Sequence, residues 1–145
     1  MKFGELEIYP VFLGNMKLCG GPVFGVIPRK IWGRYIKHDE DNNIILALYT
    51  LLIVKDDEAV ILDVGFGNKV SQRILKAFGV HNEYNAWEAI EEFGYYAGDI
   101  TRVIPSHLHI DHSGGCTKIV DGKIVPSFPN ATYYIQEQEF EDAMS

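Results

Sequence analysis

Cysteine is scarce in this sequence, and its two cysteines, Cys19 and Cys116, lie far apart. No Cys-x-x-Cys pair is present, so the sequence indicates neither a disulfide framework nor a zinc knuckle built from thiolates. We therefore expect reduced thiols and a cytoplasmic protein.

Positive charge is also in short supply. The 13 lysine and arginine residues are outnumbered by 20 aspartate and glutamate residues, which gives a formal net charge of -7. A protein that binds the phosphate backbone of a nucleic acid normally carries a basic face or stripe. Nucleic acid is therefore not expected as a partner.

Long hydrophobic runs are missing as well. The longest apolar run covers residues 44–54, well short of the roughly 20 residues needed to span a bilayer. Residues 1–7 include acidic side chains where a signal peptide would need an apolar stretch. We expect no membrane association, and we interpret residues 44–54 as a buried strand.

The pattern that remains is typical of one α/β domain over residues 1–145, a length sufficient for a hydrophobic core. Glycines at 79 and 94 are expected to end two helices. In chain order, the pattern predicts an edge strand at 6–13, a long loop at 14–25, a helical turn at 28–32, a β-hairpin of 44–54 and 59–64 with a charged turn, helices at 70–78 and 87–93, a strand at 100–104, a hairpin excursion at 117–129, a strand at 132–135 and a helix at 136–144.

Three of the five histidines fall within six positions, where His107, His109 and His112 are interleaved with Asp111. In an extended segment, His107 and His109 point to the same side, so both imidazoles can reach one cation at about 2.0–2.1 Å. If the chain then turns, Asp111 and His112 can begin a second metal site. The alternatives are a loop of solvated histidines and a noncatalytic structural zinc, although structural zinc sites are usually closed by cysteines.

Two glycines, Gly114 and Gly115, follow the cluster directly. Without side chains they would let the backbone approach the site closely. An ordinary turn explains them equally well.

The sequence of residues 106–115, Ser-His-Leu-His-Ile-Asp-His-Ser-Gly-Gly, preceded by Ile-Leu-Asp-Val-Gly at 61–65, resembles the metallo-β-lactamase superfamily. The resemblance implies an αββα sandwich, with two sheets inside and helices outside. It implies two zinc ions, one bound by His107 and His109 and the other by Asp111 and His112. Asp111 would also act in catalysis, by steering a bridging hydroxide or protonating the leaving group, and Asp63 would brace the ligands from behind.

The reaction implied by this resemblance is hydrolysis of a small ester or lactone by a metal-bridging hydroxide. The oxygen-reducing di-iron branch has glutamate in the place of His109, so histidine there favours zinc hydrolysis. Residues 21–28 together with Trp32 are similar to the branch of N-acyl-homoserine lactonases and organophosphate hydrolases. These residues either line a substrate pocket, pack in the core or make an oligomer contact.

The resemblance is incomplete, because the family supplies a third histidine, a bridging aspartate and a final histidine farther along the chain. After His112 this sequence has no histidine. We expect the chain to cover about the N-terminal half of the domain and to be truncated at its C-terminus. Three explanations stay open: a truncated piece, a site completed by a second copy or another chain, or weak metal binding. The alternative function is a catalytically incompetent fragment or a noncatalytic metal-binding or assembly module.

Overall fold

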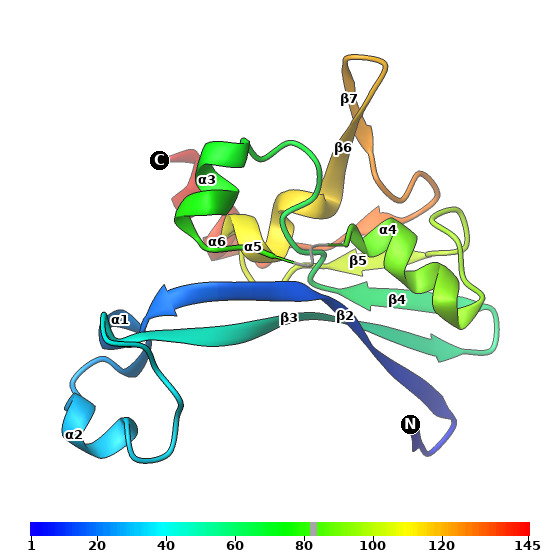
Figure 1. Cartoon of the computed structure of the whole chain (residues 1–145). Coiled ribbons are helices and arrows are strands. Elements are labelled where there is room, and N and C mark those ends of the chain that lie inside the picture. The colour runs from blue at the N-terminus through cyan, green and yellow to red at the C-terminus, as the bar shows by residue number, and fades with distance from the viewer. Residues whose placement is uncertain (82–83) are drawn as a thin grey trace.

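The computed structural model describes residues 1–81 and 84–145. In these residues, a six-stranded sheet has the order β1-β2-β3-β4-β5-β8, and β6 and β7 form a separate hairpin (Figure 1). The strands are β1 (Lys2–Phe3), β2 (Leu6–Cys19), β3 (Asn43–Lys55), β4 (Glu58–Leu62), β5 (Arg102–Ile104), β6 (Thr117–Val120), β7 (Lys123–Pro126) and β8 (Thr132–Tyr133). The helices are α1 (Gly20–Phe24), α2 (Arg29–Trp32), α3 (Gln72–Ala77), α4 (Ala86–Ala89), the 3-10 helix η1 (Ile90–Phe93), α5 (Ile110–Ser113), the 3-10 helix η2 (Gly114–Cys116) and α6 (Glu137–Met144).

The predicted α/β class is confirmed, and so is the hairpin of β3 and β4, which turns at residues 56–57. The predicted helix ends are confirmed too, since Gly79, two residues after α3, and Gly94, directly after η1, have φ values of 54° and 80°. Strands β4, β5 and β8 run parallel to one another. The carboxyl ends of β4 and β5 therefore lie at the same edge of the sheet.

The hydrophobic core lies between the sheet and the helical segment α4–η1, which crosses one face of it (Figure 1). Alternate residues of each strand point to this face, as the period of a strand requires. Its fully buried members are Val11, Leu13, Leu52, Ala59, Ile61, Val64, Ala86, Trp87, Ile90, Ile100, Val103 and Phe128. In the described parts of the chain, no helix is long and apolar enough to cross a membrane.

The prediction of a long loop at residues 14–25 is wrong. Strand β2 continues to Cys19, where it pairs with Asn43 of β3, and α1 follows it. The register shifts between Phe12 and Gly14, and Gly14 has a φ of 140°. The glycine therefore forms a bulge that bends the strand without ending it.

The expectation that residues 44–54 form a buried strand is only half right. Leu52 is fully buried, but Ile45 and Tyr49 on the opposite face are 62% and 53% exposed. The strand is thus buried on the face that meets α4–η1 and open on the other. An unbroken apolar run does not distinguish these two cases.

Candidate metal centre

The histidine cluster lies at the carboxyl edge of the two parallel strands β4 and β5. Asp63 directly follows β4, and Ser106 and His107 come two and three residues after the end of β5. Because the two strands end side by side, residues more than 40 positions apart in the sequence come into contact. This edge brings together all five residues that the sequence singled out.

The rings of His107 and His109 face each other on either side of Leu108. Nε2 of His107 lies 2.8 Å from Nδ1 of His109, and their ring centroids are 4.5 Å apart. The backbone then turns into α5, which carries Asp111 and His112. The ring of His112 lies 4.1 Å from that of His107, so the three imidazoles form one group. The two rings lie together and a turn follows them, but the chain bends at residues 107 and 109 instead of running extended as expected.

Asp63 holds this group from behind. Its Oδ1 accepts a hydrogen bond from the backbone N–H of Ser106 at 2.6 Å, and its Oδ2 accepts one from the Ser106 hydroxyl at 3.0 Å. Nδ1 of His112 lies 2.9 Å from the same Oδ2. With Nδ1 engaged, Nε2 of His112 is left to face the site, where it lies 3.4 Å from Oδ2 of Asp111.

The backbone of the cluster is packed tightly against the segment that follows β4. Val64 N–H donates to the carbonyl of His112, and Gly115 N–H donates to that of Gly65, both at 2.8 Å. A Cβ on Gly115 would lie 2.1 Å from the Val64 carbonyl oxygen, and one on Gly114 would lie 2.3 Å from that of Phe66. The two glycines are therefore required for close approach to the backbone of residues 64–66, a role that differs from the expected approach to the metal site.

Lys69 is a residue of this region that the sequence gave no signal for. Its ammonium group donates to the carbonyl oxygens of Gly114 and Thr117, and the neighbouring Asn68 side chain bonds to the backbone N–H and C=O of Ile119. Burial lowers the pKa of Lys69 and raises the pKa of the Cys116 thiol to about 11. Cys116 is thus a protonated, partly buried residue behind the site.

The donor types fit zinc, which binds imidazole nitrogen and carboxylate oxygen. Two ligands of a tetrahedral zinc ion lie about 3.3 Å apart, so the facing nitrogens of His107 and His109 would have to separate by only about 0.5 Å. Among residues 1–81 and 84–145, however, no three His, Cys, Asp or Glu side chains are placed to hold one ion. The described residues therefore offer part of a ligand set.

The aromatic residues before β3 have a packing role. Trp32 is buried, stacks on Phe24 with ring centroids 4.7 Å apart, and meets the edge of His38. A pocket of about 500 Å³ lies nearby. It is lined by Lys17, Tyr35, Ile36, Lys37, His38, Asp39, Asn43 and Ile45. Of the three roles considered for Trp32, the structure supports core packing.

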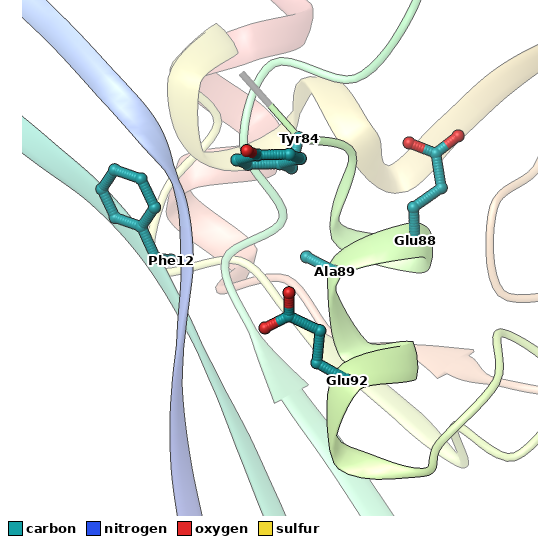
Figure 2. Close-up of a pocket in the computed structure, with 5 residues that line it drawn as sticks. All are labelled: Phe12, Tyr84, Glu88, Ala89 and Glu92. Atoms are coloured by element: carbon teal, nitrogen blue, oxygen red, sulfur yellow. The ribbon is translucent and has the colours of Figure 1, made fainter. Parts of the chain in front are cut away.

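A second pocket, of about 350 Å³, lies between β2 and the helical segment α4–η1 (Figure 2). Phe12 and Tyr84 form its aromatic walls, and Glu88, Ala89 and Glu92 complete the lining. None of the clustered histidines lines it. Its carboxylates are separate from the candidate metal centre.

Comparison with known proteins identifies the family. The model of the family described as "Metallo-beta-lactamase superfamily" matches residues 46–144. The structure is similar to that of a "probable metal-dependent hydrolase" from Staphylococcus aureus, with a TM-score of 0.90 and 31% sequence identity over 99% of this chain and 51% of that one. It also shares its fold with AidC, described as a dizinc quorum-quenching lactonase, with a TM-score of 0.72 and 22% identity over 97% of this chain and 45% of that one.

A curated relative is the N-acyl homoserine lactonase AttM of Agrobacterium fabrum, which is 34% identical over 58 residues, 40% of this chain and 19% of that protein. The chain spans about half the length of the two solved structures. The fold match covers nearly all of this chain, and the family model covers most of it, including the histidine cluster. The chain therefore belongs to the metallo-β-lactamase superfamily.

Proposed function

We propose that this chain supplies the N-terminal part of the active site of a zinc-dependent hydrolase that opens a lactone or cleaves another small ester. The observation that carries the proposal is the grouping of His107, His109, Asp111 and His112 at one sheet edge, with Asp63 bonded to the group from behind. The family accounts for hydrolysis. Support for a lactone comes from AttM and AidC, both of which are described as lactonases.

In this proposal, His107 and His109 hold one zinc ion, and Asp111 and His112 hold the other. Zinc in such a site supplies a water of lowered pKa and stabilises negative charge that develops on a carbonyl oxygen. Asp63 fixes the ring of His112 through Nδ1, which keeps Nε2 available as a ligand. The ring of His112 would therefore be oriented before any substrate binds.

Asp111 has a second role in the proposal, as the group that moves a proton. Ester cleavage leaves an alkoxide that needs a proton. Asp111, ionised as a zinc ligand, would take the proton that the attacking water gives up and pass it to that alkoxide. The Asp111 side chain is 21% exposed, so it is accessible from solvent yet held against Nε2 of His112. Both features suit a proton donor at the mouth of a site.

The alternative is a noncatalytic metal-binding or assembly module. It is favoured by one observation: in the described residues, no three potential ligands converge on one point. Further ligands, from residues outside this sequence or from a second chain, would then be needed before turnover. We place either form in the cytoplasm, because both cysteines are free.

A substrate panel tests the proposal. The test uses the zinc-loaded protein with a complete ligand set, that is, this chain together with the residues or partner chain that supply the remaining ligands. It would be assayed with an N-acyl homoserine lactone, a linear ester and a phosphotriester, with proton release followed at constant pH. We expect the lactone to react fastest and Asp111→Asn to lower its rate at least about 100-fold. Asp121→Asn is the matched control, because Asp121 lies in the β6–β7 turn. Faster cleavage of the linear ester would contradict the lactone assignment, and zinc binding without turnover would favour the noncatalytic module.

A further inference from the structure

We infer that Glu139, on the last helix of the chain, is a positioning residue for the His107–His109 pair. Its Oε1 accepts a hydrogen bond from the backbone N–H of Leu108 at 2.8 Å. Leu108 is the residue between the two histidines, so this bond acts on the peptide that joins the proposed zinc ligands. The inference rests on the proposed zinc site and adds to it a residue 27 or more positions away in the sequence.

The carbonyl group of Leu108 is hydrogen-bonded as well. The Ser113 hydroxyl donates to the carbonyl oxygen of Leu108 at 3.0 Å and lies 3.2 Å from that of His109. The backbone dihedrals on either side of Leu108 decide the directions in which the side chains of His107 and His109 leave the chain. Glu139 and Ser113 together therefore fix the direction of both imidazoles.

Glu139 differs from every other residue of α6, all of which the structure describes. It is the one side chain of the helix that is partly buried, and the remaining residues of Glu137–Met144 are exposed. Among residues 1–81 and 84–145, and apart from bonds to the flanking residues Gln136 and Ser145, its bond to Leu108 is also the one side-chain hydrogen bond that joins α6 to the rest of the chain. The helix is thus attached to the metal loop through this carboxylate.

Helix capping does not explain this arrangement. Glu139 is the third residue of α6, a position from which glutamate commonly bonds back to the N–H of the capping residue. Here the capping residue Gln136 accepts from the Glu139 N–H at 2.7 Å, but the Glu139 carboxylate points away to Leu108. A residue that served only the helix would use its side chain within the helix.

Zinc affinity, measured by competition with a chelator, tests the inference. Groups that orient metal ligands typically contribute 10–100-fold to affinity, so we expect Glu139→Ala to weaken zinc binding at least about 10-fold. Glu139→Gln keeps an acceptor oxygen at the same reach and should restore most of the affinity. Glu137→Ala is the matched control, because Glu137 is an exposed acidic residue in the same first turn. Equal affinity in Glu139→Ala and the unaltered chain would overturn the inference.

A metal-free measurement gives a second, independent readout. Amide hydrogen exchange at Leu108 should be at least about 10-fold faster in Glu139→Ala than in the unaltered chain and unchanged in Glu137→Ala. Unchanged exchange in Glu139→Ala would also overturn the inference. If Glu139→Ala does not fold, Glu139→Asp replaces it, since it keeps the charge but shortens the reach by one methylene. Failure of the unaltered chain to bind zinc would instead overturn the proposed site itself, so the two failures are distinguishable.

Discussion

Asp63 and His112 lie 49 residues apart in the sequence, yet Oδ2 of Asp63 is 2.9 Å from Nδ1 of His112. Asp63 reaches this position with a φ of 56°, in the left-handed region that few residues other than glycine, asparagine and aspartate adopt. A carboxylate behind a ligating imidazole fixes its tautomer and raises its basicity. The pair is therefore one of the links between the end of β4 and the histidine cluster.

Replacing Asp63 by asparagine should weaken zinc binding by about 10–100-fold, because the carboxylate that orients His112 is lost while the left-handed backbone remains acceptable. Chelator competition measures the affinity. Asp56→Asn is the matched control: Asp56 also has a positive φ, 51°, but lies in the β3–β4 turn. Equal affinities in the two variants would show that Asp63 does not support the site.

Gly115→Ala should destabilise the fold by about 2–3 kcal/mol or prevent folding, because its Cβ would lie 2.1 Å from the Val64 carbonyl oxygen. Urea denaturation measures the change in the free energy of unfolding. Gly98→Ala provides the comparison, since the nearest atom to its Cβ would be 3.7 Å away, and we expect a change within about 0.5 kcal/mol there. A Gly115→Ala chain as stable as Gly98→Ala would mean that the two loops are not packed as described.

The thiol of Cys116 should be slow to alkylate. Burial raises its pKa to about 11, so at pH 8 the reactive thiolate is scarce, whereas Cys19 is exposed. We expect iodoacetamide at pH 8 to label Cys19 at least about tenfold faster than Cys116, as followed by mass spectrometry. In urea the two rates should converge; a rapid reaction of Cys116 in the folded chain would be inconsistent with its burial.

Because the pKa of the Cys116 thiol is raised, the free energy of unfolding should depend on pH. Since the pKa of the folded Cys116 thiol lies above its ordinary value of 9.0, the unfolded chain releases a proton more easily. This contribution to the free energy of unfolding is complete below about pH 9 and is lost as the pH rises through about 11. Urea denaturation at several pH values should show that the free energy of unfolding of the unaltered chain falls between about pH 9 and pH 11. The fall should be smaller in Cys116→Ser.

Local sequence signals predicted much of the fold. The charged break between two apolar runs gave the β3–β4 hairpin, and Gly79 and Gly94 marked the ends of α3 and η1. Gly14 misled the prediction, because a glycine at a bulge and a glycine in a loop are alike in sequence. The open face of β3 was also missed, since burial depends on which other segments pack against a strand.

The sequence likewise predicted only part of the candidate site. The spacing of His107, His109 and His112 predicted two adjacent imidazoles followed by a turn, and the structure places the two rings together just before α5. Their binding of one metal ion stays a prediction. Lys69 and Glu139 were not predicted, because each acts through a hydrogen bond to a backbone group more than 30 positions away. Neither hydrophobic periodicity nor a short sequence motif indicates a hydrogen bond of this kind.

The central claim is that the histidine cluster is a zinc site, and zinc stoichiometry tests it most directly. Elemental analysis of the purified chain after dialysis against zinc would be compared with a variant carrying His107→Ala and His109→Ala. We expect at least about one zinc ion per unaltered chain and a clear loss of zinc in the variant. Equal zinc content in both chains, or none in the unaltered chain, would contradict it.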